Sequence, residues 1–472
     1  MSNLRPTQSG TFSLVRRSLS ANARKLVSFQ QQVATGKRIL KPSDDVIGSS
    51  RALSFRRQIA SADRYLSTIG SSRPTVDAAT AALEQGGTLI TEARTLLLQS
   101  MNGTLNQSDR TSLANQIELL LDSLLDVANT KSGEEYLFSG TETGGRAFER
   151  GGDGKVAYRG NQVVRKVAIG SDAELAIGIP GSEAFGRFEF SGLNFSDLTG
   201  VRVGTSANQG VGDEEITVRH DATTGVLGGG ITLASGGAKD TIIGARALVV
   251  DSAAGTVQLG NGEAVDIPNP LTADFVVKDE FGSEVYLDFS GYTGAAVNTT
   301  LTGTGSVSLD GVSFTAFTGT ETDLQLIDAG TGSVVHLNMN DVDRAGSDLV
   351  HFAGTVNVFT VLEGIVSDLK NESGLETNEL VNRLGLRLDE LDRNHSNVIG
   401  ALGTLGGSAQ RMQLTETQTQ ELDLRLRGLL SNEEDADFSE LILDLTQTER
   451  TLELAQLSGT RLIQTSLLNF LR

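Results

Sequence analysis

The feature that most constrains this chain is an apolar seam near its beginning that no neighbouring segment covers. Over residues 10–35 apolar side chains recur in alternating steps of three and four, with Asn22 filling the one gap. This spacing is typical of the a and d positions of a heptad coiled coil, which requires a second helix. The seam consists of Phe12, Val15, Leu19, Leu26, Phe29 and Val33.

The end of the chain carries a second seam with the same spacing. Residues 1–64 are rich in Lys and Arg, whereas residues 433–453 are rich in acids, with Arg450 as their basic residue. Opposite charges beside two seams select a partner helix, so the two ends are predicted to form one coiled coil, although each charged run alone also fits a solvated helix face. The second seam consists of Phe438, Leu441, Leu445, Thr448, Leu452, Ala455, Gly459 and Leu462.

Composition excludes several classes of protein. The 472 residues include no cysteine and no tryptophan, and the net charge is −20 at pH 7, which argues against general nucleic-acid binding. No disulfide framework or thiol nucleophile is available. No stretch approaches the roughly 18 apolar residues of a membrane span, and MSNLRPTQSG lacks the apolar core of a cleaved signal peptide.

Helices are predicted on both sides of the middle of the chain. Gly36 is expected to end the first helix, and Ser43 with Asp44 and Asp45 to begin the next, which extends to about Ser100. A third helix is expected to start at Ser108 or Asp109. Helix returns after Gly354 and continues in a long seam to residue 429, where the acidic final segment follows.

The middle of the chain has β composition. Residues 134–140 are predicted as a strand, and residues 156–161 with 163–169 as a hairpin. Residues 186–350 are rich in Gly, Thr, Ser and Val with short alternating runs, which indicates one or two small sandwiches or barrels. Residues 274–287 match residues 323–337, which suggests a duplicated β unit.

The predicted fold is therefore α+β and multidomain, with helical coiled-coil terminal domains and a central all-β insertion. Five segments are expected: residues 1–40 and 431–472 as the terminal coiled-coil helices, 41–185 and 353–430 as a helical core domain with a β-hairpin, and 186–352 as the inserted β domain or domains.

No enzyme is expected from the residue patterns. The run Gly151–Lys155 fails the phosphate-loop pattern at two positions, and the acids around Asp341 lack two ligands of a calcium loop. The four histidines are scattered, and no nucleophile–base pair, metal cluster or cofactor fingerprint stands out. We therefore predict no catalytic, cofactor-binding or metal site.

Several motifs in order resemble the bacterial flagellin superfamily, and within it the hook-associated junction proteins. They are Gly36–Arg38 with Pro42–Asp45, Asn102–Leu105 with Asp109–Ala114, Glu135–Gly140, and Glu434–Asp437 with Ser466–Leu471. The resemblance covers roughly residues 1–185 and 355–472, and residues 186–350 form a larger insertion than in the compact junction proteins.

The resemblance implies a structural protein that links the flagellar hook to the flagellin filament. The implied partners are other copies in a ring, the first hook-associated protein, flagellin and an export chaperone, with no nucleic acid or membrane among them. The implied place is extracellular, at the hook–filament junction, reached by type III export without a cleaved signal peptide. The absence of cysteine fits passage as an unfolded chain.

Assembly is expected to use the two seams and the apolar end of the chain. The expected interface residues are Phe12, Val15, Leu19, Leu26, Phe29, Val33, Phe438, Leu441, Leu445, Leu452, Leu467, Leu468, Phe470 and Leu471. Two alternatives remain open at this point: a filament flagellin, and a surface-binding protein that acts through the β insertion.

Overall fold

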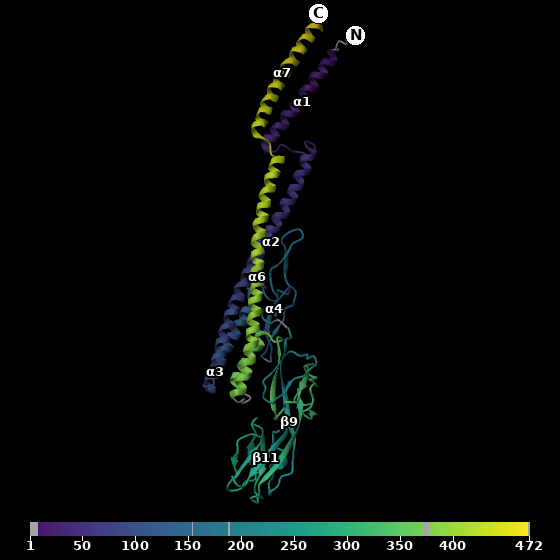
Figure 1. The fold of residues 1–472 in the computed structure, drawn as a ribbon. Helices are drawn as coiled ribbons and strands as arrows, with labels where there is room; N and C mark the ends of the chain where they lie inside the picture. The colour runs from purple at the N-terminus through teal and green to yellow at the C-terminus, as the bar shows by residue number, and fades with distance from the viewer. Residues whose placement is uncertain (1–7, 153, 187–188, 372–374, 376, 471–472) are drawn as a thin grey trace. The chain divides into compact units, whose positions relative to one another are not determined.

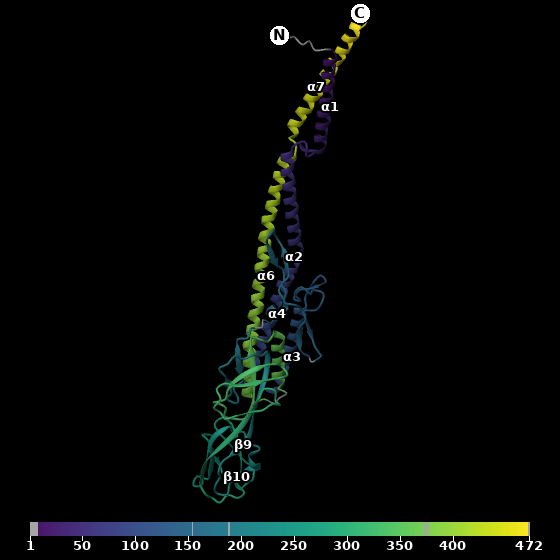
Figure 2. The same cartoon turned by 90° about the vertical axis from the view of Figure 1, so that its right-hand side faces the viewer.

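The computed structural model describes residues 8–470 except 153, 187–188, 372–374 and 376 (Figure 1). The chain divides into two compact units. Unit 1 comprises Met1–Arg73, Val167–Leu175 and Gln410–Arg472, and unit 2 comprises Pro74–Lys166 and Ala176–Ala409. Helices at both ends and a sheet-rich middle confirm the predicted fold class (Figures 1 and 2).

Unit 1 is built from four helical segments that come from the two ends of the chain. They are α1 (Gln8–Thr35), the first part of α2 (Val46–Ser100), the last part of α6 (Thr377–Glu434), and α7 (Phe438–Phe470). Within this unit α2 and α6 are joined by ion pairs from Arg73 to Glu416 (3.0 Å) and from Arg427 to Asp63 (3.1 Å).

The turn between α1 and α2 follows the predicted capping chemistry, with one correction. Gly36 ends α1 at φ +68°, a left-handed conformation that favours glycine, and its N–H donates to the carbonyl of Gln32. Asp45 rather than Ser43 caps α2, because its Oδ1 accepts from the N–H of Gly48 at 2.8 Å. Asp44 instead accepts from the N–H groups of Leu40 and Lys41 within the turn.

Unit 2 contains the remaining parts of α2 and α6 together with α3 (Gln107–Ala128), α4 (Gly181–Ala184) and α5 (Val358–Lys370). The predicted start of α3 was one or two residues late, because Asn106 is the N-cap and accepts from the N–H of Asp109. The predicted 156–169 hairpin is wrong. Residues 156–158 pair with 148–150, and residues 166–168 pair with 174–176.

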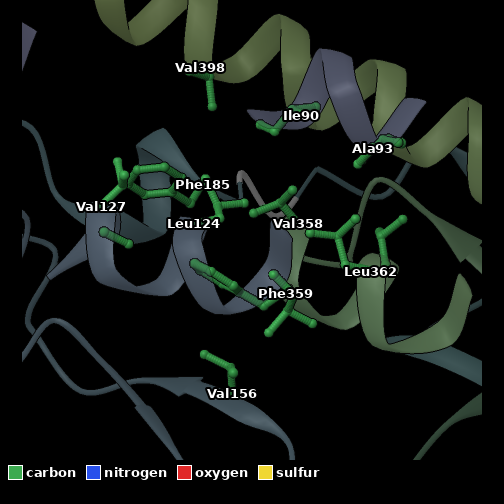
Figure 3. Packing of buried hydrophobic residues seen from close by; sticks show 14 of the residues in the cluster. Ile90, Ala93, Leu124, Val127, Val156, Phe185, Val358, Phe359, Leu362 and Val398 are labelled. Atoms are coloured by element: carbon green, nitrogen blue, oxygen red, sulfur yellow. The ribbon is translucent and has the colours of Figure 1, made fainter. Parts of the chain in front are cut away.

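The helical core of unit 2 is fully buried (Figure 3). The apolar stripe of α2 from Val76 to Leu97 is buried, and from Ala79 onwards it belongs to this core. Gly86 lies in this stripe, where a Cβ would be 3.4 Å from the ring of Phe185. Four phenylalanines from the loops, β3 (Phe148–Arg150) and α5 pack ring against ring with centroids 4.8–6.1 Å apart. They are Phe138, Phe148, Phe185 and Phe359.

The β region forms two apolar cores, each between two sheets, as the predicted sandwiches require. One sheet has the strand order β13-β12-β11-β16-β9-β20-β7 with β17 beside β16, and two three-stranded sheets have the orders β10-β15-β14 and β18-β19-β8. The strands are β7 (Gly192–Phe195), β8 (Arg202–Val203), β9 (Gly212–Thr224), β10 (Thr232–Leu233), β11 (Gly244–Asp251), β12 (Thr256–Leu259), β13 (Val265–Asp266), β14 (Phe275–Lys278), β15 (Glu284–Asp288), β16 (Val297–Ser308), β17 (Thr315–Phe317), β18 (Leu324–Ile327), β19 (Val334–Asn338) and β20 (Gly346–Ala353). Before them come β1 (Lys131–Ser132), β2 (Glu135–Tyr136), β3 (Phe148–Arg150), β4 (Val156–Tyr158), β5 (Lys166–Ala168) and β6 (Glu174–Ala176).

The predicted internal repeat is confirmed by strand register. In β14 and β15, Phe275 pairs with Leu287, and in β18 and β19 the matching residues Leu324 and Leu337 pair in the same way. The third strand of each small sheet also matches, because Leu233 of β10 pairs with Leu287 and Val203 of β8 pairs with Leu337.

The repeat extends further than the sequence indicated and is nested. Val250 of β11 pairs with Val257 of β12, and in equivalent positions Val218 of β9 pairs with Val307 of β16. We call the two copies of the repeat the host copy and the inserted copy. The host copy comprises β8, residues 212–219 of β9, residues 306–308 of β16, and β17 to β20, and the inserted copy occupies residues 220–305. The inserted copy thus occupies the place of the turn between β9 and β16 in the host copy. In the inserted copy the equivalent turn is the short loop between β11 and β12.

The copies differ where the host copy meets the helices of unit 2. Asp213 pairs across the sheet with His351, and the equivalent pair in the inserted copy is Ala245 with Thr302. His351 is 1% exposed; its Nδ1 lies 2.5 Å from Asp213 and its Nε2 lies 3.0 Å from Glu390 of α6. Arg387 of α6 binds Asp213.

This buried charge network joins β9, β20, α5 and α6. Arg387 also donates from Nε to Asp368 of α5 at 3.0 Å, and Glu390 accepts from the N–H of Gly354 at 2.6 Å. Burial opposes the charged form of Asp213, but His351 and Arg387 outweigh it and lower the pKa of this carboxyl to about 2. Burial likewise opposes the imidazolium, but Asp213 and Glu390 raise the pKa of His351 above its ordinary value.

The nested repeat generates a prediction about excision. We expect the host copy to stay folded when residues 220–305 are replaced by the loop Ser252–Gly255, which closes the equivalent hairpin of the inserted copy. Loss of Ile243 from the host core should lower its free energy of unfolding by about 2–4 kcal/mol. Hydrogen exchange of β19 measures this. A control that retains His220 shifts the register between β9 and β16 by one residue and should misfold. Loss of β19 protection in the first design would contradict the nested repeat.

The charge network generates a prediction about pH. The raised pKa of His351 contributes stability that is fully present below the ordinary histidine pKa and is lost as pH rises through the raised value. The lowered pKa of Asp213 contributes stability that is present above the ordinary aspartate pKa and is lost as pH falls towards about 2. Protection of β20 amides should therefore be greatest at mildly acidic pH. His351→Gln should reduce it there by about 1–3 kcal/mol and much less in alkali, and equal loss at both pH values would refute the assignment.

Candidate assembly interface

Helices α1 and α7 form an antiparallel pair through the two seams predicted from the sequence (Figures 1 and 2). Gly459 of α7 lies against α1, because a Cβ there would be 3.5 Å from Cγ1 of Val15 and 4.0 Å from Cδ1 of Leu19, which is ordinary contact distance. Leu441 is buried, and the other described seam residues between the helix ends are half-buried. A two-helix pair leaves its seam partly open because each knob has one neighbour.

The seam opens further at its ends. Phe12 is 53% exposed and Phe438 is 54% exposed, so the described part of the subunit covers only about half of each of these large side chains. Beside Phe12 lies a largely apolar groove of ≈ 430 Å³ between the two helices. It is lined by Phe12, Val15, Arg16, Leu19, Gln456, Gly459 and Thr460.

A cluster of ion pairs closes the base of the α1–α7 pair. Lys37 binds Asp435 at 2.8 Å and Glu434 at 3.3 Å, and Arg56 binds Glu434 at 2.7 Å. The hydrogen bond with Lys37 lowers the pKa of Asp435, and the same bond raises the pKa of Lys37. Backbone hydrogen bonds join Arg38 to Glu434 and Ala436 to Gly36, so this base is built from both ends of the chain.

The predicted charge pairing is wrong along the rest of the helices. Among the described residues the basic side chains of α1 form no ion pair, and neither do the acidic side chains of α7. Arg16 lines the groove between the helices, and none of the residues that line it with Arg16 is acidic. The residues concerned are Arg16, Arg17, Arg24 and Lys25 in α1, and Glu440, Asp444, Glu449 and Glu453 in α7.

Helix α7 also has an apolar stripe that the seam analysis missed. Leu443, Leu454 and Leu457 are 64%, 67% and 56% exposed. Positions 443, 450, 454 and 457 follow the same steps of seven, four and three as a seam, with Arg450 interrupting the apolar series. This second periodicity was visible in the sequence, but the stronger seam on the opposite face obscured it.

The expected interface residues near the end of the chain cannot be placed. Leu471 and the side chains of Leu467, Leu468 and Phe470 lie outside the described residues. Phe29, Val33, Leu26, Leu445 and Leu452 lie in the half-buried seam. The assignment of these residues to an interface between subunits stays a prediction.

Neither a membrane-spanning helix nor a metal site is found in the part of the chain that is described. No described helix is long and apolar enough to cross a membrane. No group of three or more metal-binding side chains with suitable placement occurs among the same residues.

Comparison with known proteins gives matches of one kind. Residues 11–143 match the family model described as the bacterial flagellin N-terminal helical region. The chain is 31% identical over 172 residues to "Flagellar hook-associated protein 3" of Escherichia coli (strain K12), which covers 36% of this chain and 53% of that protein. It is 28% identical over 297 residues to "Flagellin B" of Helicobacter pylori (strain J99), and this match covers 57% of this chain and 55% of that protein.

A second hook-associated protein 3, from Salmonella typhimurium, is 30% identical over 156 residues, covering 33% of this chain and 48% of that protein. The chain thus spans about half the length of the curated relatives it matches. Among solved structures, FlgL of Xanthomonas campestris aligns with a TM-score of 0.44 at 20% identity, over 80% of this chain and 99% of that chain. FlgL of Legionella pneumophila aligns with a TM-score of 0.44 at 16% identity, over 82% and 100%.

The sequence matches confirm the resemblance inferred from the motifs: residues 11–143 match the bacterial flagellin N-terminal helical region, and the chain is similar to flagellar hook-associated protein 3.

Proposed function

We propose that this protein is a structural subunit of the bacterial flagellum that joins the hook to the flagellin filament. The observation that carries the proposal is the α1–α7 pair, whose seam is only half covered and whose end rings, Phe12 and Phe438, stay exposed. Large exposed apolar side chains mark surfaces that another protein covers. The similarity to flagellar hook-associated protein 3 supports a flagellar role for this chain.

The proposal includes its partners and place. Copies of the chain form a ring, which contacts the first hook-associated protein on one side and flagellin on the other. A chaperone accompanies the chain to the flagellar export channel, and the chain acts outside the cell without catalysing a reaction. The half-open seam supports this scheme, because isolated helix pairs gain order from neighbouring subunits.

A filament flagellin is the second candidate. The match to Flagellin B of Helicobacter pylori covers more of this chain than either hook-associated match does. It is less identical at 28%, and we therefore rank the filament role below the junction role. Growth of the purified chain into long filaments would reverse this order.

Deletion of the gene tests the junction role. We expect cells without it to carry bare hooks and to release flagellin monomers into the medium, because the filament lacks the subunit on which it grows. Electron microscopy of cells and immunoblotting of the medium measure both results, and the unaltered gene should restore filaments. Normal filaments on the deletion strain would exclude the junction role.

Substitution in the seam tests the part that the helix pair plays. Leu19→Glu places a charge in the half-buried seam and should reduce filament number by at least about tenfold, because burial of an unpaired charge opposes association. Ala23→Glu, at an exposed position one turn further along α1, is the matched control and should keep filaments. Equal loss in both variants would show that the seam has no special role.

A further inference from the structure

Helix α7 has two apolar faces, and only one of them is covered within the subunit. The seam residues Leu441, Leu445 and Leu452 face α1. At about 100° of rotation per residue, the exposed leucines Leu443, Leu454 and Leu457 lie on the opposite side of the helix. A helix that is apolar on two sides packs between two neighbours.

Acidic residues flank this second apolar face, which we call the outer face of α7. Glu440 and Glu453 lie on its two edges, by the same rotation per residue. Neither forms an ion pair with a described residue. Arg450 lies within the face itself. Over residues 440–453 as a whole, the helix has four acidic residues and this one arginine.

Helix α1 presents the complementary charge on its own outer face. Arg17 and Arg24 are one heptad apart and lie opposite the α1 seam, with the 60% exposed Leu14 and with Ala21 beside them. Neither arginine forms an ion pair with a described residue; Arg24 donates instead to the carbonyl of Ser20 in its own helix. Both outer faces therefore combine apolar side chains with charges that form no ion pair with any described residue of the subunit.

We propose that the outer face of α7 in one subunit binds the outer face of α1 in a second copy of this chain. The inference rests on the proposed assembly of the protein and names the surfaces that would carry it. Within one subunit the two faces point away from each other, because each is opposite the shared seam. In a head-to-tail contact the outer face of α7 in one copy meets the outer face of α1 in the next. The leucines then supply apolar area, and the charges select the partner and the register.

Head-to-tail contacts have a consequence for the assembly. The outer face of α7 on each copy meets the outer face of α1 on the next copy. A row of copies built in this way continues until it closes as a ring or extends as a helix. A contact between two identical α7 faces would instead stop at a dimer and would place like charges together.

Charge reversal in two separate variants tests the contact. The first is Arg17→Glu with Arg24→Glu, and the second is Glu440→Lys with Glu453→Lys, each in the full chain and in cells that lack the gene. Each variant alone should reduce filament number by at least about tenfold, because every contact then joins like charges. Expressed together, the variants should restore filaments, because each reversed α1 then meets a reversed α7.

Cross-linking reads the same contact directly. The chain has no cysteine, so Leu14→Cys in one variant and Leu457→Cys in the other create single reactive sites. A bismaleimide should then join the two differently tagged variants in the surface flagella of co-expressing cells. Arg57→Glu with Arg64→Glu, one heptad apart and exposed on α2 in the same unit, is the matched control and should keep filaments.

The outcomes separate this inference from the proposed function. If the unaltered gene fails to restore filaments in the deletion strain, the proposed function fails. If it restores them but the co-expressed variants do not, and circular dichroism shows both variants to be helical, the faces bind some other protein and the inference is overturned. Loss of filaments in the control overturns it as well, because charge reversal would then act without regard to face.

Discussion

Burial of long apolar stripes by helices from opposite ends of the chain is the interaction on which the rest of the structure depends. A stripe of this kind has no stable form until a second helix covers it. In unit 2 the stripe of α2 from Val76 to Leu97 is fully covered, and its core includes aromatic rings from the loops. In unit 1 the stripe of α1 is covered by α7 alone and stays half-buried. The same sequence pattern thus yields a closed core in one unit and an open surface in the other.

The middle of the chain obeys a different constraint, because its strands pair over long distances in sequence. Alternation and turn residues were sufficient to predict β structure, and the repeated hairpins were recognisable because β14–β15 and β18–β19 are local pairs. The nesting was not predictable from local pattern. It depends on β9 pairing with both β16 and β20, and nothing in a short window of sequence states which distant strand lies alongside. The mistaken hairpin at 156–169 has the same cause, since each of its halves pairs with a different neighbour.

Charge was harder to read from the sequence than apolar spacing was. Opposite net charge at the two ends correctly indicated that the ends meet, and Lys37 with Glu434 and Asp435 shows how they meet at the base of the pair. Along the helices, pairing depends on which residues face each other in register, and there the groove that Arg16 lines contains no acidic residue. The network of Asp213, His351 and Arg387 could not be foreseen either, because its members are isolated in sequence and their alignment follows from the sheet. Ala245 and Thr302 at the equivalent positions of the inserted copy show that the sandwich itself does not require these charges.

The unpaired charges of α1 and α7 are best understood together with the open seam. Exposed ion pairs within a subunit would contribute little to its stability, because solvent screens them and their side chains lose freedom. Charges left without partners on faces that also carry leucines instead favour one arrangement of neighbours over others, at little cost to the free subunit. The half-covered seam, the exposed rings of Phe12 and Phe438, and the outer faces then belong to one design. Under the proposed assembly, the terminal helix pair is half-buried in one subunit and would gain its remaining burial among copies of the chain.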